Sequence, residues 1–380
     1  MRHGAAEQGH AAGFLFLAQG AALVRLVADG TRYHLAFAGA AGAIFAAVGQ
    51  AHTGAHGSRQ DGFVFFTAEL VAAWLNSNLE RHTILNMEIS KKFNKPRLLI
   101  IGCGDVGMRL LPLVRAHYRV FAVTSQRERF AELRAAGAVP VLANLDQPDS
   151  LRRLAGLAHH IVHLAPPPGE GQQDRRTRNV TAILPERAQV VYVSTTGVYG
   201  DLGGRWADET QTVAPRNARA LRRVDAEQVL RAWARRARGR LAILRVPGIY
   251  GADRLPLKRL EQGTPALRAE DDVYTNHIHA DDLARVVLAA LRRGVGNRIY
   301  HAVDDTELKM GDYFDMVADH FGLPRPPRLG RAELAQAVTP TLLSFMSESR
   351  RLANRRLKEE LQVRLLYPDV AAALRCIKRQ

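Results

Sequence analysis

One stretch of the chain, RLLIIGCGDVG at residues 97–107, constrains the fold more than any other. Leu98–Ile101 is an uninterrupted apolar run, which is typical of a parallel strand covered on both faces. Met108–Ala116 then continues with helical spacing. The stretch therefore predicts a strand, a tight turn and a helix in direct succession.

Three glycines separate the predicted strand from the predicted helix, and each has a physical reason to be there. Gly102 allows a tight turn, Gly104 lets backbone N–H groups approach a pyrophosphate, and Gly107 lets the helix pack closely on the strand. The positive end of the helix dipole then faces the phosphates. We therefore predict a nicotinamide dinucleotide site formed by Gly102, Cys103, Gly104, Asp105, Val106 and Gly107. The alternative is a strand-to-helix turn without a ligand.

Strands and helices alternate from residue 97 onward, which predicts an α/β fold with a Rossmann-like, doubly wound parallel sheet. We expect residues 87–250 to form the dinucleotide-binding domain and residues 251–380 a smaller substrate lobe. After the first strand, the expected strands are Arg119–Val123, Ala138–Leu142, His160–Leu164, Gln189–Ser194, Leu241–Val246 and, returning to the sheet from the lobe, Arg298–Val303. The expected helices after the first are Arg127–Ala136, Ser150–Leu157, Met310–Phe321 and Ser349–Leu361.

The end of the second expected strand carries information on the choice of cofactor. An acidic residue at this point would bind the ribose 2′-OH of NAD. Here the chain reads Thr124-Ser125-Gln126-Arg127, so that Ser125 and Arg127 offer a hydroxyl and a cation to a 2′-phosphate. The pattern favours NADP over NAD. The alternative is that Arg127 is only a solvated residue at a helix start.

Two further loops follow expected strands at the carboxyl edge of the sheet, where ligands bind in folds of this kind. The first, residues 165–169, is a rigid Ala-Pro-Pro-Pro-Gly loop, and the second begins at Pro247. We expect Ala165, Pro166 and Pro247 to contribute to the cofactor site.

The composition limits the partners of the chain. Its formal net charge is +16, but the charges are spread and carried mostly by arginine. No stripe of interleaved basic and aromatic residues accompanies them, so we expect a small-molecule substrate and no nucleic acid. Two cysteines, Cys103 and Cys376, are too few for a disulfide framework or a metal site, which fits a reducing cytoplasm.

The first 86 residues differ from the rest, because they contain no lysine and their Gly and Ala residues recur without a clear period. Their longest apolar run, Leu35–Val48, has 14 residues, short of the about 20 needed to cross a bilayer, so we expect no membrane association. We hypothesise that translation begins at Met87 and that residues 1–86 are a disordered leader or an artefact of the gene model. A signal peptide ending in this run is the alternative.

The segment VYVSTTGVYGDLGGRWADE, residues 191–209, resembles the catalytic strand of the extended short-chain dehydrogenase/reductase family, in particular its nucleotide-sugar epimerase/dehydratase branch. Residues 245–251, 276–284 and 300–304 match further segments of the family in order. The resemblance spans about residues 96–370. It implies NAD(P)-dependent chemistry on a sugar- or nucleotide-sugar-like substrate and, by analogy, a homodimer.

The resemblance also assigns catalytic positions. In that family a Ser or Thr polarises the substrate oxygen, a Tyr exchanges the proton, and a Lys four residues later lowers the pKa of the Tyr. Thr195 matches the hydroxyl position. The Tyr and Lys positions fall on Arg219 and Arg223, which stay protonated and suit the binding of an anionic substrate better than proton transfer.

Three other residues are candidates for the site. Tyr199 offers a phenol, and Asn276 and His279 belong to the segment that closes over the substrate in the family. Alternatively, His279 only holds its loop by hydrogen bonds. Two functions therefore stay open: an NAD(P)-dependent oxidoreductase or epimerase/dehydratase that lacks the Tyr-Lys pair, or a catalytically inactive sensor or regulatory protein that binds the dinucleotide.

Overall fold

The computed structural model describes residues 95–377 and, nearer the amino terminus, residues 13–15, 23–29, 32–38 and 44–50. The chain divides into two compact units, Met1–His82 and Thr83–Gln380. The leader hypothesis for residues 1–86 remains a prediction, and Met87 lies outside the described residues. The described part of the first unit is an antiparallel sheet of β1 (Gly13–Leu15), β2 (Leu23–Asp29), β3 (Arg32–Ala38) and β4 (Ile44–Gln50).

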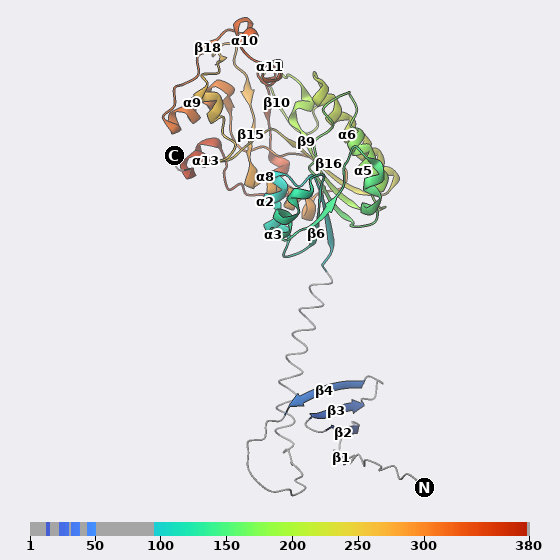
Figure 1. Ribbon diagram of the computed structural model, residues 1–380. Coiled ribbons are helices and arrows are strands. Elements are labelled where there is room, and N and C mark those ends of the chain that lie inside the picture. The colour runs from blue at the N-terminus through green and yellow to red at the C-terminus, as the bar shows by residue number, and fades with distance from the viewer. Residues whose placement is uncertain (1–12, 16–22, 30–31, 39–43, 51–94, 378–380) are drawn as a thin grey trace, which may run out of the picture. The chain divides into compact units, whose positions relative to one another are not determined.

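A seven-stranded parallel sheet forms the centre of the second unit (Figure 1). Its strand order is β16-β11-β9-β8-β5-β6-β7, so the order reverses between β5 and β8. This reversal is the topological switch point at which doubly wound sheets bind ligands. The predicted fold class is thereby confirmed. The strands are β5 (Arg97–Ile101), β6 (Arg119–Thr124), β7 (Val139–Leu142), β8 (His160–His163), β9 (Gln189–Thr195), β11 (Arg240–Val246) and β16 (Arg298–His301).

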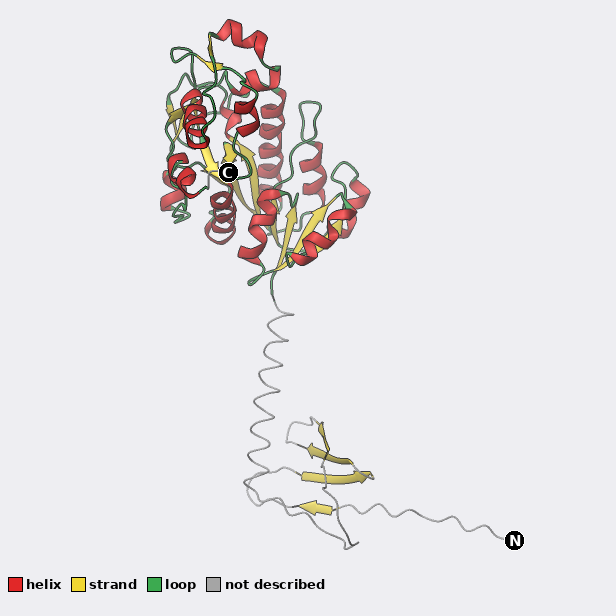
Figure 2. Cartoon of the chain, turned by 60° about the vertical axis from the view of Figure 1, so that its left-hand side comes forward, coloured by secondary structure: helices red, strands yellow, loops and turns green. Residues whose placement is uncertain are grey.

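Helices cover both faces of this sheet (Figure 2). On one face, α2 (Asp105–Val114) packs beside α8 (Ala280–Arg293), and on the other α5 (Arg175–Ile183) packs beside α6 (Ala218–Arg236). The strands therefore bury apolar side chains on both sides, as their continuous apolar runs predict. The helix residues fully buried against the sheet include Leu110, Leu111, Leu283 and Val287 on the first face and Val180, Leu230 and Trp233 on the second.

A smaller lobe follows the sixth strand of the sheet. Its α7 (Leu257–Glu261), α9 (Met310–Phe321) and α13 (Val370–Cys376) enclose a separate apolar cluster. Helix α9 has the predicted bounds and ends where Gly322 adopts a left-handed φ of 68°. The lobe is tied to the sheet where β12 (Gly248–Tyr250), which follows β11 directly, pairs with β15 (His277–His279).

The other described elements are short. They are η1 (Arg127–Arg129), α3 (Phe130–Ala135), α4 (Pro148–Leu151), η2 (Arg152–Leu154), η3 (Thr196–Tyr199), β10 (Trp206–Ala207), β13 (Ala266–Leu267), β14 (Tyr274–Thr275), β17 (Leu308–Lys309), β18 (Arg328–Leu329), α10 (Arg331–Ala337), α11 (Pro340–Phe345), β19 (Arg351–Leu352) and α12 (Arg355–Glu359). Among the helices of the described residues, none has the length and apolar character that a membrane crossing requires.

The helix predicted over Ser349–Leu361 is wrong over most of its length. Its first half is extended, because β19 pairs with β10 and the backbone N–H of Leu352 donates to Oδ1 of Asn276 at 3.1 Å. Only α12, in its second half, is helical. Tertiary hydrogen bonds thus override the local helical pattern of the arginine-rich segment.

Three buried histidines make the stability of the fold depend on pH. Burial lowers the pKa of His163 and of His277 to about 3, and that of His301 to about 4. Because an unfolded histidine titrates near pH 6.5, the unfolded chain binds more protons than the native chain below that pH. Stability is therefore full above about pH 6.5 and decreases as the pH falls, by about 2 kcal/mol per histidine at pH 5.

We expect His163→Gln to reduce the difference in unfolding free energy between about pH 7.5 and pH 5 by about 2 kcal/mol, because one proton-binding group of the unfolded chain is removed. Urea unfolding at the two pH values measures this difference. His117→Gln, at an exposed position, is the matched control and should leave it unchanged. An His163→Gln protein with the full wild-type pH dependence would contradict the assignment.

Candidate functional site

The glycine loop between β5 and α2 has a different geometry at each glycine. Gly102 has a φ of 84°, and a Cβ at this residue would lie 2.6 Å from the backbone of Ala165. A Cβ at Gly107 would lie 3.0 Å from the sulfur of Cys103, which shows how closely the helix packs under the loop. At Gly104, by contrast, a Cβ would meet no atom within 4 Å. The loop is therefore closed toward the protein and open on the side of Gly104.

This open side is the floor of a cleft of about 300 Å³ at the amino terminus of α2, which we call the cofactor cleft. Gly104 is the N-cap of α2 and supplies no side-chain hydrogen bond to the first helical N–H groups. Such groups are ready to bind an anion. The cleft is lined by Gly102, Gly104, Asp105, Val106, Gly107, Leu164, Val193, Ser194, Thr195, Arg223, Val246, Pro247, Ile249, Arg254 and Leu283.

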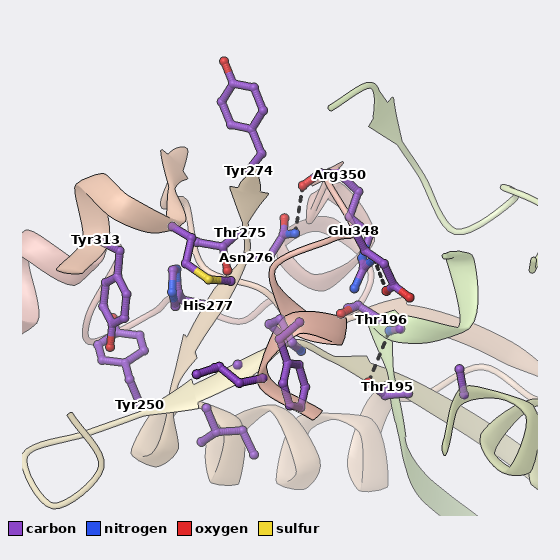
Figure 3. A pocket seen from close by; sticks show the side chains of 18 of the residues that line it. Thr195, Thr196, Tyr250, Tyr274, Thr275, Asn276, His277, Tyr313, Glu348 and Arg350 are labelled. Carbon is purple, nitrogen blue, oxygen red and sulfur yellow. Dashed lines mark hydrogen bonds and ion pairs between the residues drawn. The ribbon is translucent and has the colours of Figure 1, made fainter. Parts of the chain in front are cut away.

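A second cavity, also of about 300 Å³, lies between the carboxyl end of β9 and the smaller lobe, and we call it the lobe cavity. Figure 3 shows Thr195 and Thr196 on one side of it and Tyr250, His277 and Tyr313 on the other. The cofactor cleft and the lobe cavity share three lining residues, Thr195, Pro247 and Ile249. The two spaces therefore meet at the end of β9.

Thr195 is the polar residue of this shared wall. It ends β9 and is the N-cap of η3, because its Oγ1 accepts a hydrogen bond of 3.2 Å from the backbone N–H of Gly197. Because this bond uses one lone pair of the hydroxyl, the O–H of Thr195 can still donate to a ligand oxygen. The hydrogen bond to Gly197 thus fixes the hydroxyl of Thr195 at the wall that the two cavities share.

Arg219 and Arg223, which the sequence resemblance predicts at the Tyr and Lys positions, lie on one helix, α6, but line different spaces. Arg223 lines the cofactor cleft, where its guanidinium donates to the Tyr192 hydroxyl at 3.0 Å and to the Val193 carbonyl at 2.9 Å. Arg219 lines the lobe cavity and lies over the ring of Phe345, 4.0 Å from its centre. The structure therefore places a cation on each side of Thr195.

Tyr199 lies in neither cavity. It is buried, and its hydroxyl is 2.5 Å from Nε2 of His301. Because Nδ1 of His301 donates to the Ala353 carbonyl at 2.9 Å, Nε2 is the acceptor and Tyr199 the donor. Burial raises the pKa of Tyr199 to about 12, and the guanidinium of Arg245 lies 4.7 Å from the centre of its ring. Tyr199 thus connects Arg245 of β11 with His301 of β16, which indicates a structural role.

The two candidates from the closing segment separate as well. Asn276 lines the lobe cavity and fixes the chain that follows α11, because its amide donates to the Arg350 carbonyl at 3.0 Å. His279 lines neither cavity. Its Nδ1 accepts from the N–H of Asp281 at 3.2 Å, which caps α8, and its ring stacks on Tyr367 at 3.9 Å.

Of the remaining cofactor candidates, Pro247 lines the cofactor cleft, whereas Cys103, Ser125, Arg127, Ala165 and Pro166 do not. Ser125 and Arg127 are exposed beyond the end of β6, and Ala165 and Pro166 follow β8 behind the glycine loop. Sequence reasoning missed Arg129, whose guanidinium donates to the Cys103 carbonyl in the loop at 2.6 Å. The sequence contains two arginines at this place, Arg127 and Arg129, separated by one residue. It does not show which of the two side chains turns toward the glycine loop.

Most of the site residues that the sequence analysis did not predict line the lobe cavity. Apart from Asn217, which precedes α6, they come from separate segments of the smaller lobe, so no local motif unites them. Among them, His277 is neutral because burial lowers its pKa, and it stacks on Tyr313 at 4.3 Å. The others are Asn217, Arg259, Tyr274, Thr275, Met310, Phe314, Leu342, Phe345, Glu348 and Arg350.

Comparison with known proteins assigns the family. The model of the NAD dependent epimerase/dehydratase family matches residues 98–302, more than half of the chain. The chain therefore belongs to the NAD dependent epimerase/dehydratase family, as the sequence resemblance implied. No curated protein matches the chain in a direct comparison.

Solved structures agree with the fold. A conserved protein of unknown function from Silicibacter pomeroyi is 31% identical, with a TM-score of 0.63 over 74% of this chain and 98% of that chain. A UDP-glucose 4-epimerase from Thermotoga maritima, determined with UDP-glucose, is 16% identical with a TM-score of 0.60 over 73% and 96%. A dTDP-glucose 4,6-dehydratase from Streptomyces venezuelae, determined with NAD, is 20% identical with a TM-score of 0.59 over 74% and 96%. The latter two show similarity of fold.

The geometry of the loop predicts opposite results for two alanine substitutions. Gly102→Ala should lower the free energy of unfolding by about 2 kcal/mol or more, because it combines a left-handed φ with a backbone clash at Ala165. Gly104→Ala should change it by less than about 1 kcal/mol, because its Cβ enters open space. Urea unfolding of the two variants in parallel measures both. Equal losses would show that the loop does not have this geometry.

Proposed function

We propose that the protein is an NADP(H)-dependent oxidoreductase or epimerase/dehydratase-like enzyme acting on a sugar- or nucleotide-sugar-like substrate. The observation that carries the proposal is the wall that the two cavities share at Thr195, Pro247 and Ile249. A substrate in the lobe cavity lies against the same residues as a cofactor in the cleft. Hydride transfer requires such contact between the two reactants.

The cofactor cleft fits a dinucleotide. The space beside Gly104 is empty of protein atoms, and the first N–H groups of α2 have no side-chain cap. Gly102, Gly104 and Gly107, with Cys103, Asp105 and Val106 between them, would hold the pyrophosphate. The apolar part of the wall consists of Val106, Leu164, Val193, Val246, Pro247, Ile249 and Leu283. When bound, the nicotinamide cofactor supplies the hydride acceptor or donor.

Thr195 and Arg223 are the protein residues that would act on the reacting oxygen of the substrate. The hydroxyl of Thr195 donates to a carbonyl or hydroxyl oxygen of the substrate, which polarises it. Arg223 is held in place by Tyr192 and Val193 and keeps a fixed positive charge in the cleft. It takes over the charge of the family's Lys, but it cannot exchange a proton near neutral pH.

NADP is the cofactor that we propose, because the end of β6 carries no carboxylate that would select the ribose 2′-OH. Ser125 and Arg127 are both exposed there, and Arg127 has no ion pair within the described part of the chain, its contact being with the Phe130 ring at 5.9 Å. Neighbouring Arg129, in contrast, is engaged by Cys103 and Glu132. Arg127 is therefore the arginine that is free to bind a 2′-phosphate.

We also propose that the protein acts in a reducing cytoplasm and, by analogy with the family, as a homodimer. Both cysteines are free thiols, and burial raises the pKa of Cys103 to about 11, so that its thiol packs under the loop as an apolar group.

A second candidate function, a sensor that binds the dinucleotide without turnover, is favoured by one observation. The sequence resemblance aligns Arg219 and Arg223 with the family's Tyr and Lys, and Tyr199, the phenol that the sequence offered as a candidate, is buried away from both cavities. In this case the lobe cavity would bind an effector rather than a substrate.

Substitution of Thr195 distinguishes the two functions. Thr195→Val keeps the shape of the side chain but removes the hydroxyl, and we expect it to lower the rate of hydride transfer about a hundredfold with little change in NADPH affinity. Thr195→Ser should retain most of the rate. The measurement is NADPH oxidation or formation across a panel of nucleotide sugars and oxidised sugars, together with detection of epimerised or dehydrated product, because these two reactions return the cofactor to its starting state. Wild-type protein that binds NADPH but never exchanges hydride would support the sensor.

The cofactor preference has a separate test. Arg127→Gln should weaken NADPH binding about tenfold and leave NADH binding unchanged, because only the 2′-phosphate meets this cation. Fluorescence titration of the purified chain gives both dissociation constants. Arg134→Gln is the matched control, since Arg134 lies over the same Phe130 ring at 5.5 Å. Equal losses for NADPH and NADH would assign Arg127 to general cofactor binding.

A further inference from the structure

Two arginines of the lobe cavity have no carboxylate partner. Within residues 95–377, no carboxylate lies at ion-pair distance from Arg219 or Arg259, although other arginines of the same region are paired. Both guanidinium groups lie instead over aromatic rings, Arg219 over Phe345 and Arg259 over Phe314 at 4.1 Å. Half-buried cations without a counter-charge are costly unless a ligand supplies one.

Arg259 is the deeper of the two. Its guanidinium donates to the Pro265 carbonyl at 2.9 Å and contacts the sulfur of Met346 at 3.6 Å, while its Nε is buried and has no hydrogen-bond partner among the described residues. Burial lowers the pKa of Arg259 to about 10. The side chain thus spans α7, α9 and the end of α11. It lines the cavity, and its Nη1 makes no hydrogen bond to the described residues.

Arg219 lies at a more open part of the same cavity, since Phe345 beneath it is 50% exposed. Burial also lowers the pKa of Arg219. The negative charge of Glu348, which lies beyond ion-pair distance, opposes this shift and raises the pKa. Glu348, however, is paired with Arg350 at 2.8 Å and accepts from Asn217 at 3.3 Å. The acidic group nearest to Arg219 is therefore already neutralised.

The charged side chains of the lobe cavity do not balance. Three arginines against one glutamate leave a formal charge of +2, and His277 adds none because it is neutral above about pH 3. The rest of the wall combines aromatic and apolar side chains, with Tyr274, Tyr313 and Phe345 among the rings, and neutral polar ones, namely Thr195, Thr196, Asn217, Thr275 and Asn276. A cavity of this kind binds a compact organic molecule with an anionic group at one end.

We infer that the ligand of the lobe cavity carries a phosphate or carboxylate group, and that Arg219 and Arg259 bind it. This inference deepens the proposed function, on which it rests for the identity of the cavity as the substrate site. Arg219, at the family's Tyr position, is then a specificity residue that selects charged over uncharged substrates. The planar guanidinium of arginine suits both oxyanions, since each presents a pair of oxygens.

The test measures binding rather than turnover. Calorimetric titration of the full chain, saturated with NADPH so that the glycine loop is occupied, compares glucose 1-phosphate, glucuronate and uncharged glucose. We expect at least one of the two anions to bind ten times more tightly than glucose. Which one binds better separates a phosphate site from a carboxylate site.

Substitutions then locate the binding. Arg219→Gln and Arg259→Gln should each weaken the anion at least tenfold and leave glucose unaffected. The matched control is Arg216→Gln, three residues before Arg219 on the exposed approach to α6, which should change nothing. Urea unfolding of each variant shows whether the protein is folded, and Arg219→Gln alone decides the question if Arg259→Gln is unstable.

Equal affinity for charged and uncharged probes, no binding of either anion, or full anion affinity in a folded Arg219→Gln protein would overturn the inference. NADPH uptake is recorded independently in the same samples. If NADPH fails to bind while anion binding still depends on Arg219, the proposed enzymatic function is wrong and the anion site stands. If NADPH binds and the anions do not, the anion site is wrong and the proposed cofactor site stands.

Discussion

The contact between Gly102 and the backbone of Ala165 is the constraint on which the rest of the site depends. The loops after β5 and β8 approach so closely that a side-chain carbon at Gly102 would lie 2.6 Å from its neighbour. The N–H groups of Leu164 and Ala165 both donate to the Ile101 carbonyl, at 2.8 and 3.1 Å, and fix this approach. As a result, the amino terminus of α2 opens onto the switch point of the sheet.

A buried polar network supports the other half of the site. Ser194 donates to Glu227 at 2.7 Å, and Glu227 binds Arg245 through two hydrogen bonds of 3.1 and 2.7 Å. Arg245 in turn covers the ring of Tyr199, which is bonded to His301. The network links β9, α6, β11 and β16 directly behind Thr195. Because its members are buried and mutually bonded, it holds the end of β9 rigidly where the two cavities meet.

The sequence predicted the sheet and the glycine loop well because both follow local rules. Apolar runs, glycine positions and strand ends each depend on a few neighbouring residues. The family resemblance of residues 191–209 indicated Thr195, whose role stays a prediction. The lobe cavity could not be predicted, since Arg259, Phe345 and Glu348 come together only through tertiary packing. The same limitation explains the helix wrongly expected over Ser349–Leu361, which pairing with distant β10 makes partly extended.

The wall shared by the two cavities has a thermodynamic consequence. An occupant of one space covers Thr195, Pro247 and Ile249 and so changes the surface that the other occupant meets. Two ligands in van der Waals contact do not bind independently, and their coupling free energy is the same whichever arrives first. If the proposed cofactor and substrate occupy the two spaces together, each alters the affinity of the other by one common factor.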